Sequence, residues 1–140
     1  MARSRILIVD DSEIDRMMLR RAFGKLEIGL PELEEAKDAN SAIACLGDHH
    51  FDAIFLDVNM PGEDGFFVLR WLRRAQPRTW PLVFMYSSSD HPDDVAQAYD
   101  GQATSYLCKP SDFDSIRLLM GDCMGLIDKA ARPATRVPMS

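Results

Sequence analysis

The stretch Ile6-Leu7-Ile8-Val9-Asp10-Asp11-Ser12 decides the fold of this chain. Four consecutive apolar residues, three of them β-branched, are typical of a strand buried on both faces of a parallel sheet. The run stops at two acids, and Ser12 can then cap a helix whose first turn carries Glu13 and Asp15. We therefore expect a buried strand that leads directly into a helix.

Three later stretches repeat this pattern of an apolar run that stops at a polar residue. Ala53-Ile54-Phe55-Leu56 stops at Asp57, the run over 81–86 stops at Ser87, and the run over 105–108 stops at Lys109. Residues 31–38 fit a short edge strand. Two helices are predicted in the first part of the chain, one from the Ser12 cap to Phe23 and one over 40–47 capped by Asn40 or Ser41. A third has Phe67, Leu69 and Leu72 inside and Arg70, Arg73 and Arg74 outside, and a fourth starts at Pro92 with Val95 and Tyr99 toward the core. The last covers 112–127, with one apolar stripe formed by Phe113, Ile116, Leu119, Met120 and Cys123.

Strands that alternate with helices predict a fold of the α/β class. We expect a five-stranded parallel sheet, doubly wound, in a three-layer α/β/α arrangement. In such folds the ligand site lies beyond the carboxyl ends of the strands. The residues that end the strands are therefore the candidates for function.

The composition narrows the class of protein. A chain of 140 residues fits one domain. The chain has 22 acidic and 16 basic residues, and this net negative charge argues against nucleic-acid binding. No apolar run is long enough to cross a membrane, so we expect no membrane partner. Three cysteines, an odd number, argue against a disulfide framework and favour a reducing compartment, the cytoplasm.

The chemistry of the strand ends favours phosphoryl transfer. Asp10, Asp11 and Asp57 would meet at one edge of the sheet, where three like charges repel and at least one carboxyl must be protonated unless a cation is present. Mg²⁺ prefers such oxygen ligands. Lys109 adds a positive charge and Ser87 a hydroxyl donor, so Asp57 can act as a nucleophile toward a phosphoryl group. Each residue alone fits a turn, a cap or a solvated side chain, but all fall at the same end of successive strands.

The ordered set resembles the receiver domain of two-component response regulators, especially the stand-alone chemotaxis-type receivers. The likeness spans about residues 4–127. The spacing of Asp57, Ser87 and Lys109 matches as well as the residue types. The matching motifs are Val9-Asp10-Asp11-Ser12, Leu56-Asp57-Val58-Asn59-Met60-Pro61-Gly62-Glu63-Asp64-Gly65, Ser87 after an apolar strand, and Tyr106-Leu107-Cys108-Lys109-Pro110.

This resemblance implies a flavodoxin-like strand order, 2-1-3-4-5, and a role for each matching residue. The phosphoacceptor is Asp57, and the donor is a phosphohistidine in a sensor histidine kinase or a histidine phosphotransfer protein. The roles implied for the others are Mg²⁺ binding by Asp10, Asp11, Asp57 and the backbone carbonyl of Asn59, a phosphoryl-binding switch by Ser87, Lys109 and Tyr106, and tuning of dephosphorylation by Asn59 and Ser89. The Lys109-Pro110 bond is usually cis in this family.

Further features of the resemblance leave alternatives open. Tyr106 resembles an aromatic residue that turns inward in the active state, and it also fits an ordinary half-buried strand tyrosine. The first helix, with Ile14, resembles a docking site for the kinase, and it also fits a plain amphipathic helix. The chain has Gln102-Ala103-Thr104-Ser105 where Gly-Ala-Asp-Asp is usual, so that loop can differ in shape, and Ser88 where Ala is common, which can slow access to the acyl phosphate.

We expect residues 1–127 to form the receiver domain and residues 128–140 a polar, flexible tail. With no effector after the tail, the protein would act as a single-domain response regulator that signals by contact with a downstream protein on the helix 4–strand 5–helix 5 face. It would not be an enzyme, although phosphotransfer and autodephosphorylation would be self-catalysed. The nearest alternative is a phosphorelay shuttle between histidine proteins.

Two other classes share parts of this pattern. A phosphatase of the haloacid dehalogenase type also forms an aspartyl phosphate, but it needs Asp-x-Asp, whereas Asp10 and Asp11 are adjacent. A flavodoxin has the same fold class, but its first loop cradles a phosphate that the acids here would repel. Turnover of a phosphate monoester would favour the phosphatase, and a coloured protein would favour the flavin-binding flavodoxin.

Overall fold

The computed structural model describes residues 3–27, 29–75 and 81–130. Ten elements alternate along the chain: β1 (Arg5–Val9), α1 (Glu13–Gly24), β2 (Glu32–Ala36), α2 (Ala39–Asp48), β3 (Ala53–Leu56), α3 (Gly65–Ala75), β4 (Leu82–Ser87), α4 (Pro92–Asp100), β5 (Ser105–Cys108) and α5 (Phe113–Ala130). The strands form one parallel sheet in the order β2-β1-β3-β4-β5. The predicted fold class and strand order are confirmed.

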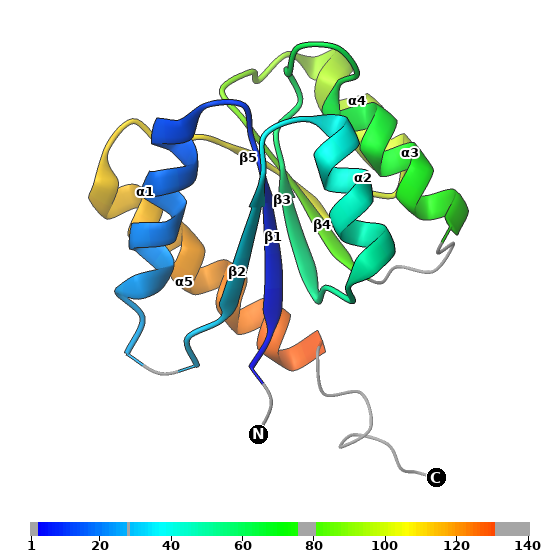
Figure 1. The fold of residues 1–140 in the computed structure, drawn as a ribbon. Coiled ribbons are helices and arrows are strands. Elements are labelled where there is room, and N and C mark those ends of the chain that lie inside the picture. Colours follow the sequence, from blue (N-terminus) through cyan, green and yellow to red (C-terminus); the bar gives the residue numbers. More distant parts are fainter. Residues whose placement is uncertain (1–2, 28, 76–80, 131–140) are drawn as a thin grey trace, which may run out of the picture.

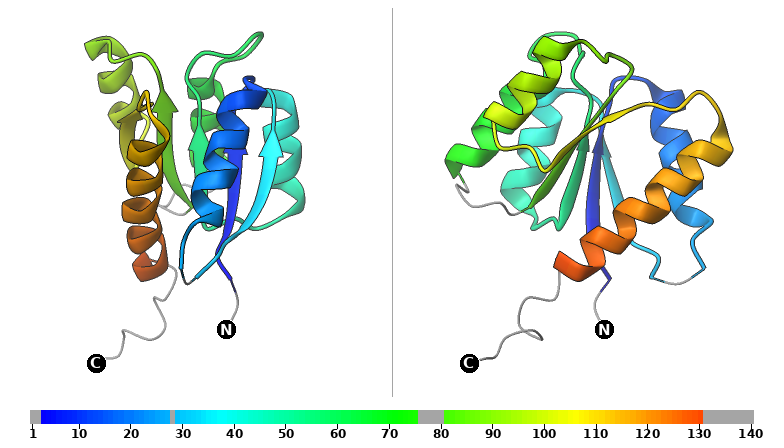
Figure 2. Two further views of the ribbon diagram at one scale, coloured as in Figure 1. Left: turned by 90° about the vertical axis from the view of Figure 1, so that its left-hand side faces the viewer. Right: turned by 180° about the vertical axis from the view of Figure 1, so that it is seen from behind.

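The sheet lies between two layers of helices (Figures 1 and 2). α1 and α5 cover one face, and α2, α3 and α4 cover the other. Alternate residues of β1 serve the two cores, because successive side chains of a strand point to opposite faces: Leu7 and Val9 pack with α2 and α3, and Ile6 and Ile8 pack with α1 and α5. The carboxyl ends of the strands lie together at the upper edge in Figure 1.

The first helix begins as predicted. The Ser12 hydroxyl accepts a hydrogen bond from the Asp15 backbone N–H at 3.2 Å, as an N-cap residue does. The cap predicted for α2 is wrong, because Asp38 takes that position instead of Asn40 or Ser41. The Asp38 carboxylate accepts the Ser41 N–H at 2.8 Å, and the Ser41 hydroxyl contacts the Asp38 backbone in return.

Two predicted helix faces are corrected. Arg73 was expected on the outside of α3, but it is 8% exposed. Its guanidinium donates to the carbonyl of Gln102 at 2.9 and 3.1 Å and to that of Pro81 at 3.1 Å, so three hydrogen bonds compensate for its burial. These bonds tie α3 to the segments that precede β4 and β5.

On α4, Tyr99 was expected in the core, but it is 50% exposed and Ala98 is the buried residue. The Tyr99 hydroxyl accepts the backbone N–H of Tyr106 at 3.1 Å, and that N–H lies on the edge strand β5. From its position outside the core, the tyrosine thus satisfies an edge-strand donor that pairs with no other strand.

The last helix extends beyond its predicted end. α5 continues to Ala130, so residues 128–130 are helical and the predicted tail begins too early. Ile127 is fully buried in the core that α5 shares with α1, and the Ser4 hydroxyl donates to Asp128 Oδ1 at 3.4 Å, so the helix stays packed past the predicted boundary. The remainder of the predicted tail, residues 131–140, lies outside the described part of the chain.

Candidate functional site

The strand-end residues singled out from the sequence meet at one edge of the sheet. Asp10 follows β1, Asp57 follows β3, Ser87 ends β4 and Lys109 follows β5. The hydrogen-bond ladder of the sheet extends to them, since the Asp57 N–H donates to the Val9 carbonyl at 2.9 Å and the Lys109 N–H to the Ser87 carbonyl at 2.8 Å. Their backbone positions are therefore set by the sheet and not by free loops.

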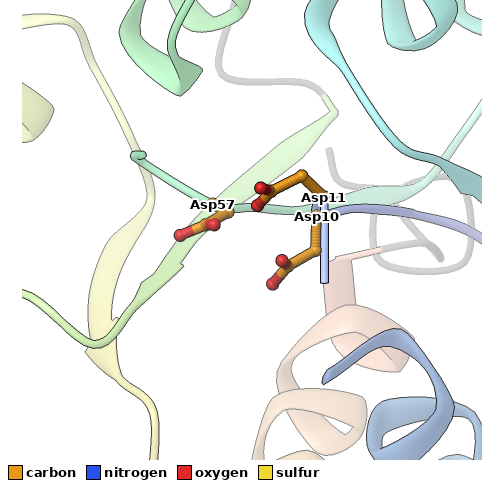
Figure 3. A group of neighbouring side chains, drawn as sticks. All are labelled: Asp10, Asp11 and Asp57. Atoms are coloured by element: carbon orange, nitrogen blue, oxygen red, sulfur yellow. The ribbon is translucent and has the colours of Figure 1, made fainter. Parts of the chain in front are cut away.

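Three carboxylates form a close acidic cluster at this edge. Asp10, Asp11 and Asp57 each offer an oxygen, and these oxygens lie within 4.8 Å of one another (Figure 3). Asp10 and Asp57 are buried, and Asp11 is exposed at the mouth. An all-oxygen donor set with few protein ligands fits a hard divalent cation such as Mg²⁺, which retains several waters.

The electrostatics of Asp57 reflect this crowding. Burial, followed by the negative charge of Asp10, raises the pKa of Asp57, and Lys109 and the Asn59 backbone act in the opposite direction; the net result is a pKa of about 7. Without a cation the carboxyl group is therefore partly protonated at neutral pH. A bound divalent ion would favour the charged carboxylate, which is the nucleophilic form.

Lys109 is shared among three carboxylates. Its Nζ lies 2.8 Å from Asp10 Oδ2, 2.8 Å from Asp15 Oδ2 and 3.8 Å from Asp57 Oδ2. Burial lowers the pKa of Lys109, but the hydrogen bonds to Asp10 and Asp15 outweigh it and the net shift is upward. The lysine is thus protonated, and positively charged, at neutral pH. Sequence reasoning gave Asp15 only a helix-end role, because nothing in the chain order links residue 15 to residue 109.

Hydrogen bonds connect the loop after β4, which contains Ser89, to Ser87 at the end of β4 and to Tyr106 on β5. The fully buried Ser87 hydroxyl accepts the Ser89 N–H at 3.2 Å. The Tyr106 hydroxyl donates to the Ser89 carbonyl at 2.7 Å, and burial raises the pKa of Tyr106. The Ser89 hydroxyl donates to Asp94 Oδ2 on α4 at 2.7 Å, a partner that the sequence gave no reason to expect. The loop therefore links the strand end at Ser87 to both β5 and α4.

Gly65 allows a close approach of the backbone beside Asp57. A Cβ at this position would lie 2.0 Å from the Asp57 carbonyl oxygen, so no larger residue fits. The Gly65 N–H donates to the Val58 carbonyl at 2.9 Å and thereby starts α3 against the end of β3. Asn59 is exposed on the same loop, and Ser88 is exposed after β4.

Solved structures resemble this fold closely. The Mn²⁺-bound form of the response regulator Rcp1 aligns with a TM-score of 0.77 at 24% identity, covering 86% of this chain and 94% of that one. The chemotaxis response regulator CheY4 of Vibrio cholerae aligns with a TM-score of 0.74 at 26% identity, covering 88% of this chain and 99% of that one. The class of protein defined by the fold and the strand-end acids is that of CheY-like receivers.

The family follows from sequence comparison. The profile of the response regulator receiver domain matches residues 6–120, and the chain belongs to this family. The transcriptional regulatory protein TcrA of Mycobacterium tuberculosis is 36% identical over 112 residues, which make up 80% of this chain and 42% of TcrA. The chain thus spans less than half the length of that relative.

Proposed function

We propose that this receiver domain is a phosphorylation switch that takes a phosphoryl group onto Asp57 from a phosphohistidine. The observation that carries the proposal is the meeting of Asp10, Asp11 and Asp57 with Lys109 at the carboxyl edge of the sheet. Three carboxylates and one ammonium group suit a reaction in which charge on phosphoryl oxygens must be stabilised. Membership of the receiver family supports the same reading.

In the proposed reaction, a carboxylate oxygen of Asp57 attacks phosphorus. A P–O bond forms while the P–N bond of the phosphohistidine breaks, and the histidine nitrogen keeps the electron pair of that bond. Lys109, 3.8 Å from Asp57 Oδ2, is near enough to pair with a phosphoryl oxygen after a small side-chain movement. The Ser87 hydroxyl is the proposed second contact, and water later hydrolyses the acyl phosphate with tuning by Asn59 and Ser89.

The proposed cofactor is Mg²⁺. Asp10, Asp11, Asp57 and the backbone carbonyl of Asn59 would hold it, and it would neutralise the charge of the acids and of the incoming phosphoryl group. The donor set of the acidic cluster supports this assignment. The Mn²⁺-bound structure of Rcp1 shows that a protein of the same fold binds a divalent cation.

The proposed partners are a sensor histidine kinase or a histidine phosphotransfer protein as donor, and a downstream protein on the α4–β5–α5 face. The bond from Tyr106 to the Ser89 carbonyl supports this face, because it joins β5 to the loop after Ser87. A movement of Ser87 toward a phosphoryl group would pass through that loop to α4 and β5. A shuttle role between histidine proteins uses the same site and stays the alternative.

The remaining expectations concern the chain as a whole. Among the described residues no helix is long and apolar enough to span a membrane. Cys45, Cys108 and Cys123 are free thiols, which supports the cytoplasm as the proposed compartment. A receiver domain that extends to the end of α5 at Ala130, and that acts by itself, is likewise part of this proposal.

The test is covalent labelling. With Mg²⁺ and acetyl phosphate or a phosphoramidate, the protein should gain one hydroxylamine-sensitive phosphoryl group by intact mass, and Asp57→Asn should gain none. Glu63→Gln, which removes an exposed acid from the same loop, is the matched control and should label like the wild type. Labelling of Asp57→Asn, or no labelling of the wild type, contradicts the proposal.

Two further measurements separate the metal role and the enzyme alternative. Chelation with EDTA should abolish labelling, and equal labelling with EDTA would remove Asp10 and Asp11 from metal binding. Release of many equivalents of phosphate from a phosphate monoester would favour a phosphatase over a switch.

A further inference from the structure

The ammonium group of Lys109 lies closer to α1 than to the phosphoacceptor. Its distance to Asp15 Oδ2 is 2.8 Å, whereas its distance to Asp57 Oδ2 is 3.8 Å. The lysine side chain is 13% exposed, so water competes little for its donors. Lys109 has a flexible stem and a compact charge, and its position depends on which acceptors surround it.

Asp15 differs from the other carboxylates near Lys109. Asp10 and Asp57 belong to the acidic cluster proposed to hold Mg²⁺, so a bound cation would take up much of their negative charge. Asp15 stands in the first turn of α1, outside that cluster, and its charge would stay available to the lysine. With the cluster occupied, Asp15 is therefore the strongest competitor for Lys109.

We propose that Asp15 is a positioning residue that draws Lys109 toward α1 and so competes with a phosphoryl group on Asp57 for the ammonium. This inference rests on the proposed function. When Asp57 is phosphorylated, Lys109 leaves Asp15 and pairs with a phosphoryl oxygen. Because the Lys109–Asp15 ion pair is lost in this step, the phosphorylated state is less stable than it would be without Asp15. The identity of residue 15 thereby sets how readily this receiver adopts its phosphorylated form.

The consequence is specific in sign. A neutral residue at position 15 should strengthen binding of a phosphoryl mimic. Removing a plain structural contact would leave that affinity unchanged or weaken it. Because the Asp15 side chain is 38% exposed, the ion pair is worth no more than a surface pair, and we expect a change of about two- to fivefold.

The experiment is a calorimetric titration of the Mg²⁺-saturated protein with beryllofluoride. Asp15→Asn and Asp15→Ser should both bind it about two- to fivefold more tightly than the wild type, and Asp15→Glu should return toward the wild-type value. Glu13→Gln is the matched control, since it removes an equal charge from the same helix turn without a contact to Lys109. It should change the affinity less than Asp15→Asn does.

The same substitution in a Lys109→Met variant tests whether Asp15 acts through Lys109. In Lys109→Met, Asp15→Asn should leave the affinity for beryllofluoride unchanged, because the shared partner is gone. An equal gain in both backgrounds, or a gain matched by Glu13→Gln, would overturn the inference in favour of a general charge effect. Unchanged affinity in both neutral variants would overturn it directly. Failure of the wild type to label at Asp57 would instead refute the proposed function, so the two failures are distinguishable.

Discussion

The central strand β3 and the edge strand β5 both end at the site, but they are built differently. All four residues of β3 are buried, and Phe55 stacks on Phe84 at 5.0 Å and meets Phe23 edge-on at 5.5 Å. The residues of β5 are half-buried or exposed. The α4 helix beside it contributes a single buried residue, Ala98, among those described.

This difference matches the roles proposed for the two strands. Asp57 is mounted on the tightly packed strand, where a nucleophile and a metal site need fixed geometry. Lys109 and Tyr106 belong to the loosely packed edge, where a second arrangement costs little free energy. The contrast teaches that one sheet can carry a rigidly held phosphoacceptor at the end of a central strand and residues that change position at the end of its edge strand.

The largest expected effect tests this contrast with the same substitution in both strands. Leu56→Ala should lower the free energy of unfolding by about 3–5 kcal/mol, because Leu56 is fully buried and leaves a cavity. Leu107→Ala, at a half-buried position of β5, should cost only about 1–2 kcal/mol. Urea denaturation measures both values. Equal losses would show that the edge strand is packed as firmly as the central one.

The next effect concerns the buried end of β3. The pKa of Asp57 rises from 3.8 in a free side chain to about 7 in the fold, so between these values the folded state holds a proton that the unfolded chain releases. In EDTA, stability should therefore fall as the pH rises from about 4 to about 7. Asp57→Asn should remove this loss and be more stable by on the order of 4 kcal/mol at pH 8.

Thermal unfolding across this pH range, in EDTA, measures the effect. Glu63→Gln, an exposed acid nearby, should keep the wild-type pH profile. A wild-type slope that persists in Asp57→Asn would mean that another group is responsible.

The smallest effect concerns Arg73, whose hydrogen bonds join α3 to the segments that precede β4 and the edge strand β5. Arg73→Met should cost about 1–2 kcal/mol, since the carbonyls of Gln102 and Pro81 lose their donors. Arg70→Met, an exposed arginine of the same helix, should stay within about 0.5 kcal/mol of the wild type. In hydrogen exchange, Arg73→Met should reduce protection in β5 more than in β3. Equal losses of protection would mean that Arg73 supports the whole sheet.

The sequence predicted the features that depend on neighbours in the chain. An apolar run that stops at an acid reads as a buried strand wherever it occurs, so β1 and β3 and the positions of Asp10 and Asp57 followed directly. The features it missed depend on partners far away. The buried Arg73 finds its acceptor in the carbonyl of Gln102, and the exposed Tyr99 accepts the N–H of Tyr106 on the edge strand.

The sequence by itself determined the class of fold, the family and the strand ends at which charged side chains gather. Tertiary structure decided how those charges are shared, namely that Lys109 bonds Asp10 and Asp15 more closely than Asp57, and that Gly65 must be a glycine because α3 abuts the Asp57 carbonyl. The physical reason is range. Hydrophobic periodicity is written in consecutive residues, whereas an ion pair or a close backbone approach depends on distances of a few ångströms that only the folded chain establishes.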